Sequence, residues 1–179
     1  AQGAQISCSY SRLSCRSSET ADGLMAASNI LALYIMNRNG SLIYELDLRG
    51  ADRLSSNDKI RLTSTFHGIS AIASQISPVS KGSTPFGFLQ PSGISSLDAD
   101  TFRVQCFHTA TGMKIMITQV PQGGQYRDHQ ELMRQTYAIY SDYALKNPFH
   151  DLDMPIRCEL FENEIKRLYA PGMVSGANR

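Results

Sequence analysis

The residue pair best suited to chemistry is Cys106 with His108. Side chains two residues apart on a strand point to the same face, so a thiolate and an imidazolium could form there and supply a nucleophile with its base. The other interpretation is a buried thiol beside a histidine at the rim of the sheet, because free cysteine packs as a small hydrophobe. We adopt the buried thiol, and rank an enzyme that uses this pair behind two non-enzymatic functions.

Other residues with catalytic chemistry do not form a recognisable set. Asp98 and Asp100 could act as a carboxylate pair, but their spacing is typical of residues that begin and end a turn between short strands. The four histidines are scattered along the chain, and no phosphate-binding glycine loop, GxSxG or HExxH motif occurs. The sequence therefore predicts no metal, no cofactor and no catalytic activity of the chain alone.

A further motif is the tripeptide Asn147-Pro148-Phe149, which matches the short peptide that endocytic adaptor domains bind. Such ligands act in disordered tails, whereas this one lies between two predicted helices. Proline cannot continue a helix and disfavours helical backbone in the residue before it. We therefore interpret the motif as a helix stop followed by a core phenylalanine, and assign three other aromatic residues to the same core. These are Tyr137, Tyr140 and Phe161.

Charge and composition narrow the class of partner. Lysine and arginine total 17 against 16 acidic residues, a formal net charge of +1, so no basic field exists to collect nucleic acid. The cysteines at positions 8, 15, 106 and 158 lack a CxxC spacing, so we expect reduced thiols in the cytoplasm. The longest apolar run, Ile30 to Met36, is far shorter than the roughly 20 residues that span a bilayer. We expect membrane contact only through partners or an added lipid.

We expect one folded domain over residues 25–170. Residues 1–24 are rich in serine and follow neither helical nor strand periodicity, which predicts a disordered N-terminal extension, with Met25 as a plausible natural start. Proline, glycine and serine in residues 79–92 predict a long surface loop, in which Phe86 and Phe88 are exposed apolar residues that could dock on a partner. Residues 171–179 are expected to form a C-terminal tail.

Five strands are predicted within this domain. Residues 30–36 are apolar on both faces and precede Asn39-Gly40, which predicts a type I′ turn, and residues 41–46 complete a hairpin whose first strand is central. Three more strands are predicted by apolar patterning, with Thr111-Gly112 turning the last two into a second hairpin. They lie near residues 94–97, 101–109 and 113–120.

Three helices complete the order ββαβββαα. The first spans residues 56–76, capped by Ser55 or Ser56, with an apolar stripe that we expect to face inward: Leu62, Phe66, Ile69, Ala73 and Ile76. The second runs from about 128 to 146, and the third from 157 to 169 with Leu160, Phe161, Ile165 and Leu168 inside. The opposite face of the first helix has few charges, which fits either a solvated face or one that binds another protein.

This element order is that of longin-like (profilin-like) trafficking domains, α+β folds with one helix on one face of a five-stranded antiparallel sheet and two on the other. The residues then resemble one family more closely, the synbindin-like subunits of the TRAPP tethering complex, over about residues 30–168. The most specific segments are residues 139–149, IYSDYALKNPF, and residues 154–161, MPIRCELF. The sequence differs from that family in two places. Residues 48–56, which join the second strand to the first helix, are too few to contain the PDZ-like insertion of animal synbindins. The loop at residues 79–92 is longer than expected for the family.

The resemblance implies a scaffold subunit beside a second longin-type subunit in TRAPP, on the cytoplasmic side of ER and cis-Golgi membranes. Together these subunits promote nucleotide exchange on an early-secretory Rab GTPase, which requires a binding surface and no catalytic residue. The alternative is a longin-type regulatory or cargo-adaptor module outside TRAPP. In either case we expect the partner to bind the outer face of the first helix, at Asp58, Arg61, Thr65, Gly68 and Ile72, with Phe86 and Phe88 as further contacts.

Overall fold

The computed structural model describes residues 29–50, 54–76, 93–120, 127–151 and 153–169. Three of the predicted regions lie wholly outside these ranges. They are the N-terminal extension (1–24), the loop at 79–92 and the C-terminal tail (171–179).

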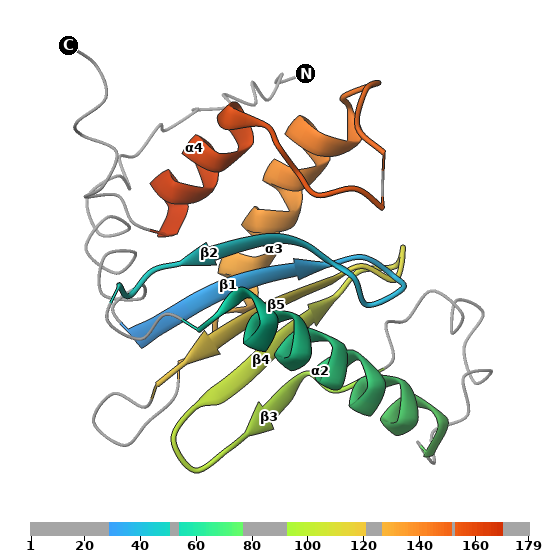
Figure 1. The fold of residues 1–179 in the computed structure, drawn as a ribbon, viewed down its shortest axis with the longest axis vertical. Helices are drawn as coiled ribbons and strands as arrows, with labels where there is room; N and C mark the ends of the chain where they lie inside the picture. The colour runs from blue at the N-terminus through green and yellow to red at the C-terminus, as the bar shows by residue number, and fades with distance from the viewer. Residues whose placement is uncertain (1–28, 51–53, 77–92, 121–126, 152, 170–179) are drawn as a thin grey trace, which may run out of the picture.

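A five-stranded antiparallel sheet forms the centre of the molecule (Figure 1). Its strands are β1 (Ile30–Met36), β2 (Leu42–Asp47), β3 (Ser96–Asp98), β4 (Arg103–His108) and β5 (Lys114–Gln119), in the spatial order β2-β1-β5-β4-β3. Strand β1 pairs with β2 on one side and β5 on the other, and almost all of its side chains are buried. The prediction that the unbroken apolar run is a central strand is confirmed.

Helices cover both faces of the sheet. Figure 1 shows α2 (Ser56–Ile76) on one side, and α3 (Gln130–Tyr140) with α4 (Glu159–Tyr169) on the other. Helix α3 continues into a π-helical turn, η3 (Ser141–Leu145). Because side chains alternate along a strand, Leu33 and Ile35 of β1 enter the core under α3 and α4, while Tyr34 and Met36 enter the core under α2. The predicted fold class, with one helix on one face and two on the other, is confirmed.

Both hairpins exist, but the type I′ turn predicted at Asn39-Gly40 is wrong. Only Gly40 has a positive φ, +86°, whereas a type I′ turn also requires one at Asn39. The Asn37 side-chain oxygen accepts hydrogen bonds from the backbone N–H groups of Asn39 (3.0 Å) and Ser41 (2.9 Å). These bonds stabilise a three-residue loop that ends in a left-handed glycine, and the second hairpin has the same arrangement with Gly112 at +85°.

The inward face of α2 differs from the predicted stripe. Its buried residues are Lys59, Thr63, Phe66 and Ser70. Of the predicted stripe only Phe66 is fully buried, while Ile69 and Ile76 are 40% and 74% exposed. Lys59, Thr63 and Ser70 are buried although their side chains are polar. A stripe predicted from hydrophobicity alone omits them and is therefore rotated around the helix, away from the face that contacts the sheet.

Two predicted core residues on the other side of the sheet also lie at the surface. Phe149 and Leu160 are exposed. The core below α4 is instead filled by Phe161, whose ring meets that of Tyr44 edge to face at a centroid distance of 4.9 Å, and by Ile165. Of the other predicted core aromatics, Tyr140 is buried and Tyr137 is partly buried.

The segment before α4 lies along the free edge of β2. The backbone N–H of Ile156 donates to the carbonyl of Ile43 at 2.9 Å, and Ile156 itself is buried. This contact holds the connection between η3 and α4 against the sheet and fixes the direction from which α4 enters the fold.

Candidate protein-binding surface on helix α2

The five predicted contact residues of α2 share one exposed face. Asp58, Arg61, Thr65, Gly68 and Ile72 are spaced 3, 4, 3 and 4 residues apart, and all are exposed. The structure therefore brings together the residues that the sequence assigned to the outer face. That a partner binds them stays a prediction, and the other two candidates, Phe86 and Phe88, lie outside the described residues.

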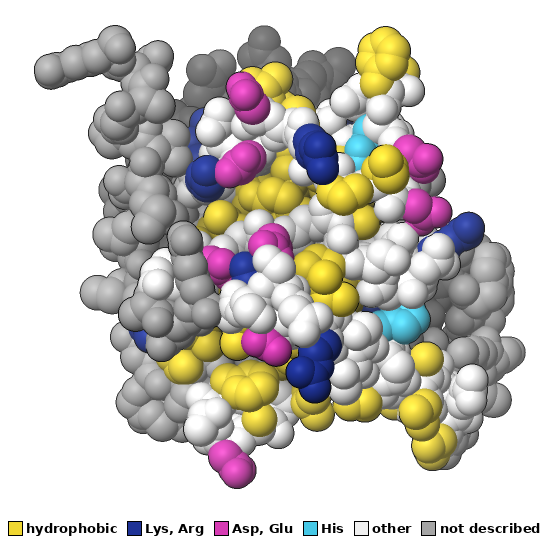
Figure 2. Space-filling model, in the orientation of Figure 1, with side chains coloured by type: hydrophobic (Ala, Val, Ile, Leu, Met, Phe, Trp, Pro, Cys, Tyr) yellow, Lys and Arg dark blue, Asp and Glu magenta, His cyan; other side chains and the backbone are white. Residues whose placement is uncertain are grey.

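This face is more apolar than the sequence indicated. Ile72 and Ile76 are 58% and 74% exposed, and Ile69, which neighbours Ile72 on the helix, is 40% exposed. Figure 2 shows hydrophobic side chains gathered near the C-terminal end of α2, at the lower right of the view. Ile69 and Ile76 were missing from the predicted surface because both were assigned inward. The exposed group of Ile69, Ile72 and Ile76 favours contact with another protein over a merely solvated face.

Charge is confined to the first turns of the helix. The carboxylate of Asp58 and the guanidinium of Arg61 approach to 3.8 Å at the surface, a distance and exposure at which an ion pair contributes little. Ser55 caps the helix, as predicted, because its Oγ accepts from the Asp58 N–H at 3.2 Å and donates to the Asp58 carboxylate at 2.7 Å. From Leu62 to Ile76 the helix carries no lysine, arginine, aspartate or glutamate.

A buried ion pair fixes α2 to the sheet. Lys59 Nζ contacts Asp47 Oδ2 at 2.7 Å and Glu45 Oε1 at 3.1 Å, and its side chain is almost fully buried. Burial acts to lower the pKa of Lys59, but hydrogen bonds to Asp47 and Glu45 outweigh it and the pKa is raised. The lysine stays charged at neutral pH and ties the first turn of α2 to β2.

Two glycines near α2 differ in the space around them. A Cβ on Gly40 would lie 2.6 Å from the ring of His67, so the tip of the first hairpin packs directly under the helix. A Cβ on Gly68 would meet nothing within 4 Å. A large side chain at position 68 can therefore project outward without disturbing the fold, which makes Gly68 a suitable place to block the surface.

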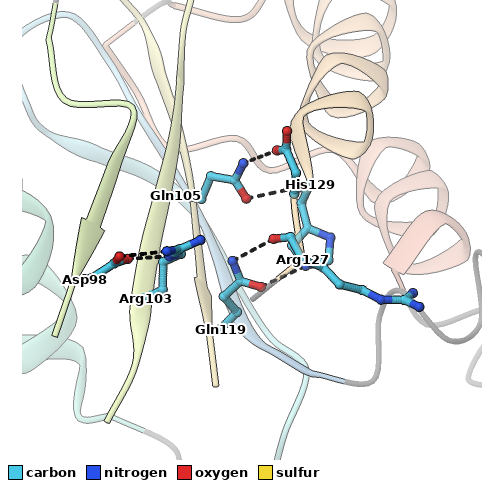
Figure 3. A network of polar contacts seen from close by, with 7 residues as sticks. Asp98, Arg103, Gln105, Gln119, Arg127 and His129 are labelled. Atoms are coloured by element: carbon cyan, nitrogen blue, oxygen red, sulfur yellow. Dashed lines mark hydrogen bonds and ion pairs between the residues drawn. The ribbon is translucent and has the colours of Figure 1, made fainter. Parts of the chain in front are cut away.

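A polar network at the start of α3 is architectural (Figure 3). The side-chain amide of Gln105 donates to the Asp128 carboxylate and accepts from the His129 N–H at 3.0 Å. The amide of Gln119 donates to the Arg127 carbonyl at 3.0 Å and accepts from His129 Nε2 at 3.1 Å. Burial lowers the pKa of His129, so its ring is neutral. The two glutamines hold the start of α3 on β4 and β5, a role that sequence analysis missed because glutamine in a strand carries no distinctive pattern.

The candidate catalytic residues are not arranged for catalysis. Cys106 is buried in the core under α2, and burial raises the pKa of its thiol to about 12, whereas a nucleophilic cysteine needs a lowered pKa. His108 Nε2 is bonded to the Ile94 carbonyl at 2.9 Å. Asp98 ends β3 in a two-pronged ion pair with Arg103, and the turn that follows is closed by the Ala99 N–H bonded to the Phe102 carbonyl at 2.9 Å.

Metal ligands and membrane-spanning helices are likewise absent from the described part of the chain. Within the described ranges, histidine, cysteine and carboxylate side chains do not gather in a group that could hold a metal ion. Across those ranges, no helix combines the length and hydrophobicity needed to cross a bilayer.

The sheet with α2 on one face and α3 and α4 on the other places the protein in the longin-like class. A model of the Sybindin-like family matches residues 30–171. The chain belongs to this family, and the resemblance found in the sequence is confirmed.

Curated proteins similar to this chain are named as subunits of one complex. Trafficking protein particle complex subunit 4 of Dictyostelium discoideum is 43% identical over 78% of this chain and 95% of its own length. The Homo sapiens protein of that name is 39% identical over 81% of this chain and 68% of its own length. Subunit 1 of the D. discoideum complex is more distant, at 24% identity over 82% of this chain and 97% of its own length. A solved Roadblock/LC7 domain from Streptomyces avermitilis is too distant to add to this assignment. Its TM-score is 0.38 at 6% identity, over 56% of this chain and 73% of that chain.

Proposed function

We propose that this protein is a scaffold subunit of a TRAPP complex and that the outer face of α2 binds a second longin-type subunit. The observation that carries the proposal is family membership over residues 30–171, shared with relatives named as TRAPP subunits. The exposed face of α2 supports it, because Gly68 leaves open space in which a second helix can approach closely, and Ile72 and Ile76 offer exposed apolar surface next to it.

The composite surface that the two longin-type subunits form, together with neighbouring subunits, promotes nucleotide exchange on a Rab GTPase. A guanine nucleotide held at picomolar strength corresponds to about 16 kcal/mol of binding free energy, and an exchange factor must supply a comparable preference for the nucleotide-free state. A standard interface buries about 800 Å² per partner and rarely provides that alone. A surface shared between subunits is therefore required, and no member of it needs an acid, a base or a nucleophile. The subunit acts at ER and cis-Golgi membranes through the assembled complex.

The test begins with the partners that copurify with the chain. Mass spectrometry of the purified assembly should identify TRAPP subunits, including a longin-type partner. An assembly of trafficking proteins without TRAPP subunits would instead support a regulatory or cargo-adaptor module.

Variants of the α2 face then locate the contact. Arg61→Glu with Gly68→Arg should release the longin partner in gel filtration or slow Rab exchange, because the first reverses a charge and the second fills open space on that face. The matched control is Arg134→Glu with Ala138→Arg, two exposed positions on α3 across the sheet. Wild-type assembly and wild-type exchange in the α2 variant would rule out this surface.

A further inference from the structure

The most exposed large hydrophobic side chain in the described part of the protein is Phe149, at 96%. It belongs to the Asn147-Pro148-Phe149 tripeptide, which follows η3 on the side of the sheet away from α2 (Figure 1). Leaving a phenylalanine in water instead of burying it forgoes about 1.5–3 kcal/mol. The function proposed for α2 does not account for this residue.

The tripeptide is held in a fixed turn by Asn147. The side-chain oxygen of Asn147 accepts from the Phe149 N–H at 3.0 Å, and its carbonyl accepts from the His150 N–H at 3.1 Å. The Asn147 N–H donates to the Ala144 carbonyl at 3.2 Å, which joins the turn to the end of η3. Pro148 restricts its own backbone and that of Asn147. The tripeptide is therefore rigid, and its aromatic ring projects into solvent.

Ending the helix requires only two of these three residues. Asn147 and Pro148 supply the backbone restriction and the hydrogen bonds, whereas the side chain of Phe149 makes no contribution to the core. A polar residue at position 149 would serve the fold equally well. A rigid turn that presents an aromatic side chain loses little conformational entropy when that side chain enters a pocket, so it is already organised as a ligand.

Charges of both signs lie around the turn. Asp151 and Asp153 follow it in the chain, and Lys146 before it is paired with Asp142 at 2.6 Å. Arg38 lines the same cavity as Asp151 and Asp153, and Arg157 lines a second cavity with Phe149 and Asp151. The aromatic ring and the fixed turn therefore define what a partner would recognise, and charge does not.

We infer that the Asn147–Phe149 turn is a binding site for a protein domain that recognises Asn-Pro-Phe, with the ring of Phe149 in an apolar pocket of that domain. This site is separate from the α2 surface. Because the two lie on opposite sides of the sheet, both can be occupied at once, and the inference does not depend on the proposed function.

The test is a calorimetric titration of the full 179-residue chain with a purified adaptor domain that binds Asn-Pro-Phe peptides. Phe149→Ala should weaken binding at least 30-fold, which corresponds to about 2 kcal/mol and is typical of a central interface residue. Leu160→Ala is the control, since it removes an exposed apolar side chain outside the turn. Both variants should unfold at the wild-type temperature, so that a loss of binding reports on the contact.

Competition distinguishes this site from a non-specific apolar contact. Excess Asn-Pro-Phe peptide should compete while a scrambled peptide does not. Gly68→Arg should bind the domain as wild type does. Absence of binding, or equal binding by Phe149→Ala, would refute the inference. Loss of binding when the chain is assembled with its copurified partners would show that another subunit covers Phe149, which also overturns it.

Discussion

Replacement of Lys59 by methionine tests how α2 is attached to the sheet. Methionine keeps most of the aliphatic stem but removes the ammonium group from Asp47 and Glu45. Breaking a fully buried ion pair by deleting one partner costs about 3–5 kcal/mol. Here the Asp47 side chain is only 15% exposed, whereas that of Glu45 is 39% exposed and can regain water. We therefore expect the free energy of unfolding to fall by about 2–3 kcal/mol, below the fully buried range because Glu45 is screened by solvent.

Urea denaturation of the purified chain at pH 7 measures this change, with the slope of the transition checked for two-state behaviour. The matched control is Lys146→Met, which removes a lysine paired with Asp142 at the surface and should cost less than about 0.5 kcal/mol. The raised pKa of Lys59 means that its contribution is complete below the unfolded value of about 10.4 and is lost as the pH rises through the folded pKa. Equal effects of the two substitutions would refute the view that Lys59 anchors the helix.

Three further predictions concern stability and reactivity. Burial lowers the pKa of His129, so its contribution to stability is present above about pH 6.5 and is lost on acidification; urea midpoints between pH 7.5 and 5 should fall, and less steeply in His129→Gln. Gly40→Ala should lower the free energy of unfolding by about 1–3 kcal/mol, because of its positive φ and the adjacent His67 ring, while Gly50→Ala, where the space is open, should change it by less than about 0.5 kcal/mol. Cys106 should resist a thiol reagent until the chain unfolds, because burial raises its pKa to about 12; labelling at the rate of an exposed cysteine would contradict this.

Local patterning predicted the architecture because it reflects backbone geometry. The apolar run of β1 and the turn glycines at positions 40 and 112 set the two hairpins, and the change to a helical period marked α2. Turn type was harder to predict, because the Asn37 side chain bonds the backbone and favours a three-residue loop over a two-residue one.

The candidate surface was predicted in part, and the errors have a common cause. The outer residues of α2 follow from helical spacing, so the five predicted contact residues, of which Asp58 is the first and Ile72 the last, were placed correctly at the surface. The inward face depends on Lys59 finding carboxylates on β2, a tertiary pairing that hydrophobicity does not contain. Phe149 was assigned to the core for a similar reason, since apolar character alone does not show whether a side chain has a place to pack.

The two edges of the sheet have different capacities for growth. The edge at β2 is occupied in part by the segment containing Ile156, whereas the opposite edge is β3, three residues long, with no strand paired beyond it among the described residues. A head-to-tail series of copies needs two compatible edges, so the segment over β2 hinders propagation by strand pairing. Among the described residues, β3 is the edge at which a strand from another subunit could be added.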